Sequence, residues 1–134
     1  MLNDLFENIQ EHLGLLDLAL LSSQKITSFA QLEDLDGVVN ETDNRERLVN
    51  VIGQVQQVIE NQINQLNAAE LKSEDIMILK SWFQDLSQWS DKMITHDKET
   101  VEFLSQQKES TTKEIAHLFK NKEMFKGYNN SPKK

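Results

Sequence analysis

The sequence predicts an all-α fold, an antiparallel and coiled-coil-like bundle of about three long amphipathic helices. One Pro and four Gly occur in 134 residues, so few positions interrupt a helix. Apolar residues recur every three or four positions over long stretches, which is the spacing of one face of an α-helix. Hydrophobic residues make up 38% of the chain, enough for one modest core. We therefore expect a single helical domain over residues 1–128 and a disordered basic tail over 129–134.

The first two helices are expected on either side of a weak segment. The first runs from about Asn3 to Gln24. The segment Ser22–Ser28 holds several poor helix formers and predicts a break. The second helix then runs from Phe29 to Leu66. Its stretch Asn40–Arg47 is wholly polar, and we expect continuous helix there because it contains no Gly or Pro; a polar core layer or a loop are the alternatives.

A turn over Asn67–Lys72 leads into the third helix. Ser73 is the expected N-cap, because acidic residues follow it in the first turn. The helix is expected to continue to Lys126, with Gly127 as its stop. Poor helix formers leave a break near Glu109–Thr112, and with it a short fourth helix, as an open alternative.

The predicted helices differ in length, and this difference is the main indication of function. The first is shorter than the other two, so it cannot cover all of their apolar faces. Connected by short turns, the three helices should be antiparallel neighbours. We expect an apolar surface left exposed at one end of the bundle.

Charge is distributed unevenly along the chain. The net charge is −8, which disfavours binding to a nucleic-acid phosphate backbone. From Lys113 to the end, six lysines against two acidic residues give +4, so the remaining residues carry −12. This basic end either docks on an acidic partner or consists of solvated lysines that favour the helix dipole.

Other sequence features bear on location. The chain has no Cys, so disulfides and thiolate metal sites are excluded. The N-terminus lacks the basic region of a signal peptide. The apolar-rich stretch Leu13–Leu21 is too short to cross a bilayer. We expect a cytoplasmic protein that does not insert into membranes.

No residue constellation indicates catalysis. Glu114 and His117 have the spacing of one di-iron ligand pair, but the second pair is missing. His96 and Asp97 are neighbours on a helix and so do not face each other. Asp97 falls near the apolar stripe and needs a partner, which predicts a polar layer. No glycine-rich phosphate loop occurs. We expect no enzyme, no cofactor and no metal.

Two groups of large apolar residues remain as candidate contact surfaces. Trp82 and Trp89 are seven residues apart and share one helix face, either as core or subunit contact or as an anchor for a partner. Near the C-terminus, a broad apolar surface beside the basic end is either core or an adaptable binding surface; it comprises Ile115, Leu118, Phe119, Met124 and Phe125.

Three short motifs carry a resemblance that covers most of the chain. They are Leu32-x-x-Leu35, Asn44-Arg45-Glu46-Arg47-Leu48-Val49, and Lys126-Gly127-Tyr128-Asn129 at the end of the long helix. This arrangement resembles the FlgN/FliT group of flagellar type III export chaperones.

The resemblance implies a helical hairpin or bundle that binds C-terminal amphipathic helices of hook-associated or filament-cap proteins. Such a chaperone prevents premature assembly and delivers its clients to the export gate. The implied client-binding residues are Val101, Leu104, Ile115, Leu118 and Phe119, and the implied gate-docking residue is Tyr128. The choice between FlgN-like and FliT-like clients stays open. A structural coiled-coil protein that forms homo-oligomers, such as a homodimer, is the alternative.

Overall fold

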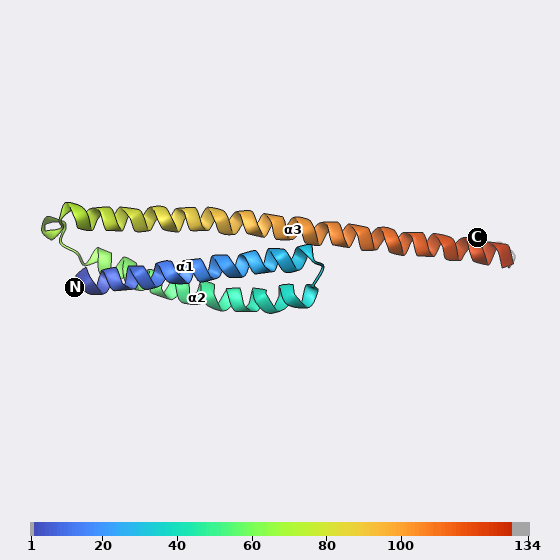
Figure 1. The fold of residues 1–134 in the computed structure, drawn as a ribbon, viewed down its shortest axis with the longest axis horizontal. Helices are drawn as coiled ribbons and strands as arrows, with labels where there is room; N and C mark the ends of the chain where they lie inside the picture. Colours follow the sequence, from blue (N-terminus) through green and yellow to red (C-terminus); the bar gives the residue numbers. More distant parts are fainter. Residues whose placement is uncertain (1, 130–134) are drawn as a thin grey trace.

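The computed structural model describes the backbone of residues 2–129 and the side chains of residues 2–118. Three long helices follow one another: α1 (Leu2–Gln31), α2 (Leu35–Asn64) and α3 (Ser73–Asn129), with a short 3-10 turn, η1 (Ala68–Glu70), before the last. α1 and α3 run in the same direction and α2 runs in the opposite one, so α2 is antiparallel to both other helices (Figure 1). The predicted all-α bundle is confirmed.

The core lies where α1 packs against both α2 and α3. Along α3, five apolar residues alternate three and four positions apart and face this core: Leu79, Trp82, Leu86, Trp89 and Met93. This is the spacing that keeps one helix face toward its neighbours. Two buried clusters result, one around Leu5, Ile9, Ile59 and Trp82, the other around Leu16, Ala19, Ile52 and Met93.

The predicted break at Ser22–Ser28 is wrong, because α1 continues through it to Gln31. Tertiary contacts override the weak helix propensity of these residues. The hydroxyl of Ser22 donates to the Glu41 carboxylate of α2 at 2.6 Å. The hydroxyl of Thr27 donates back to the carbonyl of Ser23 at 3.0 Å, within α1. Their side chains are buried and hydrogen-bonded, so they fix α1 instead of ending it.

The turn between α1 and α2 lies at residues 32–34. Glu33 takes the left-handed conformation, with φ of 61°. The amide of Asp34 donates to the carbonyl of Phe29 at 2.9 Å, which is the Schellman pattern of a helix end. The carboxylate of Asp34 then accepts from the amide of Gly37 at 3.0 Å and caps α2. A Cβ on Gly37 would lie 2.7 Å from the Phe29 ring, so the close turn requires glycine.

The predicted continuity of Asn40–Arg47 is confirmed, and so is the turn over Asn67–Lys72. Ser73, the predicted N-cap, is instead the first residue of α3, and the capping contact runs from the amide of Lys72 to the carboxylate of Asp75 at 3.0 Å. No break occurs near Glu109–Thr112, so the helix stays single.

The predicted helix lengths are wrong in a way that matters for function. α1 and α2 each contain 30 residues, whereas α3 contains 57. At 1.5 Å per residue, α3 is about 85 Å long, against about 45 Å for each of the others. The helix length that extends beyond its neighbours therefore belongs to α3 alone. α3 also passes Gly127, the predicted stop, and ends at Asn129. Of the predicted tail, residues 130–134 lie outside the described residues.

Candidate partner-binding surface

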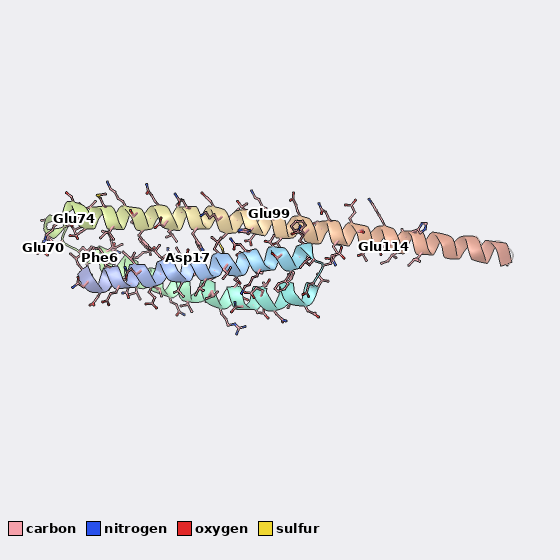
Figure 2. The ribbon with its side chains drawn as sticks, viewed as in Figure 1. Phe6, Asp17, Glu70, Glu74, Glu99 and Glu114 are labelled. Atoms are coloured by element: carbon pink, nitrogen blue, oxygen red, sulfur yellow. The ribbon has the colours of Figure 1, made fainter. Side chains whose placement is uncertain are left out.

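The C-terminal part of α3 extends past the turn between α1 and α2 with no helix beside it (Figure 1). From Lys108 to Leu118 every described side chain is exposed. Glu114 lies on this segment, well beyond the ends of α1 and α2 (Figure 2). We call Lys108–Asn129 the overhang. An isolated helix of this kind lacks the packing that gives most helices their stability, so its faces are open to a partner.

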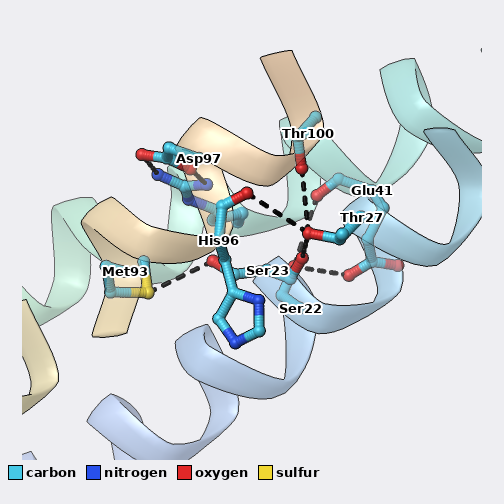
Figure 3. Close-up of polar contacts among 9 residues, drawn as sticks. Ser22, Ser23, Thr27, Glu41, Met93, His96, Asp97 and Thr100 are labelled. Atoms are coloured by element: carbon cyan, nitrogen blue, oxygen red, sulfur yellow. Dashed lines mark hydrogen bonds and ion pairs between the residues drawn. The ribbon is translucent and has the colours of Figure 1, made fainter. Parts of the chain in front are cut away.

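A cluster of polar contacts holds the three helices together near the base of the overhang (Figure 3). Ser23 donates to the sulfur of Met93 at 3.1 Å, and the hydroxyls of Thr27 and Thr100 lie 2.9 Å apart. These contacts fix α1 against α3 just before α3 leaves the bundle. Ser23 and Thr27 lie in the segment where the sequence predicted a break. That prediction rested on the low helix propensity of serine and threonine, and the same side chains form these contacts.

Asp97 has the partner that the sequence predicted, but the pair lies at the edge of the core and not in a buried polar layer. Asp97 forms two hydrogen bonds with the guanidinium of Arg45 from α2, one of them 3.0 Å between Nη2 and Oδ2. Its side chain is half exposed, so the pair joins α2 to α3 at the edge of the core. Nearby, the hydroxyl of Ser22, with the amide of Asn44, lowers the pKa of the Glu41 carboxyl.

The predicted client-binding residues lie where α3 leaves the bundle and beyond. Val101 is 60% exposed, Ile115 48% and Leu118 66%, while Leu104 is half-buried. Their spacing places all four on one side of α3. The side chains of Phe119 and Tyr128 lie outside the described residues, and so do those of Met124 and Phe125.

The apolar side of the overhang continues along the part of α3 that covers the bundle. Ile76, Phe83 and Ile94 are also well exposed, and they fall in the same alternation of three and four positions. We call the whole set the outer stripe: Ile76, Phe83, Ile94, Val101, Leu104, Ile115 and Leu118. It follows the core-facing stripe at an offset of one residue, about 100° around the helix. This offset is visible in the sequence, but the sequence does not say which of the two stripes the other helices cover.

Both tryptophans belong to the core. The indole of Trp82 is 1% exposed and donates to Nδ1 of His12 at 3.0 Å, and His12 is fully buried. The indole of Trp89 donates to the carbonyl of Leu16 at 2.9 Å. Of the interpretations offered for these residues, the structure favours the core over an anchor for a partner, because neither side chain is free to anchor one. The hydrogen bond between His12 and Trp82 had no signal in the sequence.

A second open surface lies toward the other end of the bundle. A groove of about 530 Å³ opens between α1 and α3, with Glu74 and Asp85 among its lining residues. Its apolar lining includes Phe6, Ile9, Leu13, Met77, Ile78 and Trp82. None of the predicted client-binding residues lies here.

The predicted single ligand pair lies away from the bundle. Glu114 and His117 are exposed on the overhang. Among residues with described side chains, no group of three or more His, Asp or Glu lies close enough together to hold a metal ion. Nor is any described helix long and apolar enough to cross a membrane.

No family model, curated protein or solved structure matches the chain. Its function is therefore inferred from the geometry of α3 and from the sequence motifs.

Proposed function

We propose that this protein is an escort that binds an amphipathic helix of another protein along the outer stripe at the overhang. The observation that carries the proposal is the exposure of Ile115 and Leu118 on one side of a helix that has no neighbour there, with Val101 exposed on the same side next to the end of α1. A partner helix with apolar residues at i, i+3, i+4 and i+7 fits such a face.

The sequence resemblance narrows the class of partner. We infer that the client is the C-terminal helix of a flagellar hook-associated or filament-cap protein, held before export and passed to the type III export gate. Such an escort would act in the cytoplasm, as a binding protein and not as an enzyme. The resemblance also assigns Tyr128 to docking at the gate.

The expected affinity follows from the number of apolar anchors. Each well-buried aliphatic side chain contributes roughly 1.5–3 kcal/mol. Four anchors on the escort, less the cost of association and of ordering a client helix, give a dissociation constant of about a micromolar or lower. This range suits a client that must be released again.

The test compares two double variants that each add two negative charges to the overhang. Ile115→Asp with Leu118→Asp changes the outer stripe, whereas Ser110→Asp with His117→Asp changes another face of the same helix, about 120° around its axis. Binding of a labelled C-terminal peptide from a hook-associated protein is measured by fluorescence anisotropy. The stripe variant should bind at least about 100-fold more weakly, because two buried anchors are lost. The control should bind within about twofold of the unchanged protein. Equal effects of the two variants, or no binding by the unchanged protein, would reject the proposal.

The role of Tyr128 has its own test. Tyr128→Ala should leave client binding intact and weaken association with the purified cytoplasmic part of the export gate. Unchanged gate binding would reject this assignment without affecting the client-binding surface.

A further inference from the structure

A long groove runs along the bundle, and all its lining residues belong to α1 and α3. Its first part is the groove of about 530 Å³ described above, and a second hollow of about 330 Å³ continues it along the same two helices. Leu13 and Asp85 line both parts, which therefore form one groove. We call it the α1/α3 groove. It extends over residues 6–20 of α1 and 74–92 of α3, and Phe6 and Glu74 lie at one end of it (Figure 2).

The groove has the form that a helix occupies. Its lining residues recur at alternating steps of three and four, which keeps them on one face of each helix. On α1 they include Phe6, Ile9, Leu13, Leu16 and Leu20, and on α3 Glu74, Ile78, Ser81, Asp85, Gln88 and Lys92. The groove is about 21 Å long on α1 and about 27 Å long on α3, the length of a helix of about 14–18 residues.

The groove is apolar inside and mainly acidic in charge. Ile9 and Trp82 are buried in it, and Met77 is 67% exposed beside them. Its charged lining residues are three exposed carboxylates and one lysine: Asp17, Glu74, Asp85 and Lys92. A helix with an apolar face flanked by Lys or Arg complements both properties, whereas an acidic helix would be repelled.

We propose that the α1/α3 groove binds a basic amphipathic helix of a partner protein, which packs against α1 and α3 as the fourth helix of a bundle. Its apolar residues at i, i+3, i+4 and i+7 contact Ile9, Leu13 and Met77, and its basic residues lie beside the three carboxylates. A groove about 27 Å long and 10 Å wide presents only roughly 300 Å². This is below the ≈ 800 Å² per partner of a standard interface, so the complex is transient, with a dissociation constant of about 1–100 μM.

A second copy of this chain does not match the groove. α1 carries four acidic residues and one lysine, and α2 five acidic residues and two arginines, so either helix of another copy brings charge of the same sign. The overhang is basic, but a symmetric pair of straight α3 helices would need its apolar side and the groove on the same side of α3. Ile115 and Leu118 lie about 100° around the helix from the groove-lining residues. The occupant is therefore a different protein.

This inference does not rest on the proposed function. Asp85 and Ile115 are about 45 Å apart along α3, so a client at the overhang leaves the groove free. A protein that binds the client peptide but no helix in the groove overturns this inference alone. A protein that binds a helix in the groove but no client peptide overturns the proposed function alone.

Two synthetic 18-residue peptides serve as probes for the full chain. Both place leucines at i, i+3, i+4 and i+7, and these are flanked by lysines in one peptide and by glutamates in the other. In isothermal titration calorimetry, the lysine peptide should bind one to one in the range given above and more weakly in 300 mM than in 50 mM NaCl. The glutamate peptide should bind at least about tenfold more weakly. No binding of the lysine peptide, or equal binding of both, would overturn the proposal.

Charge reversal locates the binding site. Asp17→Lys with Asp85→Lys changes the groove, and Asp43→Lys with Glu46→Lys makes the same change in net charge on α2, which does not line it. The groove variant should bind the lysine peptide at least about tenfold more weakly, and the α2 variant within about threefold of the unchanged protein. Equal losses would mean that the peptide responds to net charge alone, against the proposal.

A second pair of variants tests the apolar lining without changing charge. Met77→Ser with Ile78→Ser should weaken binding of the lysine peptide at least about tenfold. Val51→Ser with Val58→Ser removes two exposed apolar residues from α2 and should change it by no more than about twofold. Circular dichroism checks that each variant remains helical. A groove variant that stays helical and binds normally would refute the apolar contact.

Two further measurements separate the groove from other sites. Ile115→Ser with Leu118→Ser, on the overhang, should leave binding of the lysine peptide unchanged, and a tenfold loss would place the peptide there instead. Sedimentation equilibrium of the chain alone should give the monomer mass of 15.5 kDa. A dimer that Asp17→Lys with Asp85→Lys dissociates would assign the groove to a second copy and overturn the proposal.

Discussion

Trp82→Phe measures how much the buried bond between α3 and α1 stabilises the bundle. Trp82 donates to His12 at 3.0 Å, and neither side chain is more than 1% exposed. Phenylalanine keeps most of the apolar contact but removes the donor, so Nδ1 of His12 is left without a partner. An unpaired buried acceptor costs about 1–3 kcal/mol, and the space left by the smaller ring adds on the order of 1 kcal/mol. We expect the free energy of unfolding to fall by about 2–4 kcal/mol.

A double-mutant cycle separates the hydrogen bond from the packing. His12→Leu alone leaves the indole N–H of Trp82 unpaired, whereas His12→Leu with Trp82→Phe leaves no polar group unpaired. The double variant should therefore be about 1–2 kcal/mol more stable than the sum of the single losses predicts. Urea unfolding at pH 7.5, followed by far-ultraviolet circular dichroism, gives all four free energies. Losses that add within about 0.5 kcal/mol would refute a stabilising role for the bond.

The same pair predicts a loss of stability in acid. Burial lowers the pKa of His12 from 6.5, and the backbone of Ile52 opposes this shift. Nδ1 accepts from Trp82, so protonating it would break that bond. As pH falls below about 6.5, the unfolded chain binds a proton that the folded chain does not, and the free energy of unfolding falls by at most about 1.4 kcal/mol per pH unit. Above pH 6.5 both states are neutral and His12 has no effect. His12→Leu should remove the slope between pH 6.5 and 5.5, and a slope unchanged in this variant would contradict the assignment.

Three further substitutions test the turn and the ion pair, and Gly53→Ala serves as a control for the first of them. Gly37→Ala should lower the free energy of unfolding by about 1–2 kcal/mol in urea, because its Cβ would lie 2.7 Å from a phenylalanine ring; Gly53→Ala, with nothing within 4 Å, should raise it by about 0.5–1 kcal/mol. Glu33→Gly should stabilise the protein by roughly 1 kcal/mol and raise Tm, because φ of 61° suits glycine. Arg45→Met should cost about 1 kcal/mol or less, because the ion pair with Asp97 is partly exposed, and the loss should shrink in 1 M NaCl. Equal responses of the two glycine variants, a lower Tm for Glu33→Gly, or a loss independent of salt would each contradict the corresponding contact.

Helix content and most helix continuity could be predicted from local sequence. The polar stretch Asn40–Arg47 stays helical because nothing in it forces the backbone to turn. The turn over Asn67–Lys72 follows from residues that hydrogen-bond to nearby backbone, as Asn67 does to the amide of Ala69 at 3.1 Å. In these places the local preference and the final structure agree.

The boundary between α1 and α2 could not be predicted in this way. Local propensity favoured a break at Ser22–Ser28, but contacts across three helices stabilise the helical form there. The turn forms instead where Asp34 can cap α2 and Gly37 leaves room for the Phe29 ring. The contacts across the helices join residues far apart in the chain, so they leave no periodic pattern in the sequence.

The candidate surface was predicted in part. Residue type identified Ile115 and Leu118 as part of a candidate surface, and the family resemblance implied Val101; the structure places all three on one exposed side of α3. Phe119 and Tyr128 stay predictions, because their side chains are not described. The exposure of Ile76 and Phe83 could not be predicted, because a stripe of apolar residues does not say which side of a helix its neighbours cover.

The sequence by itself determined that this chain forms long amphipathic helices, since apolar spacing and the scarcity of Gly and Pro act within each helix. The tertiary structure decided which apolar stripe is buried and which is left open. The physical reason is that the end of α1 and the start of α2 lie at the same point along α3, so the core-facing stripe of α3 is covered only as far as that point. The outer stripe continues from Ile76 to Leu118, and most of its side chains are half or more exposed to solvent.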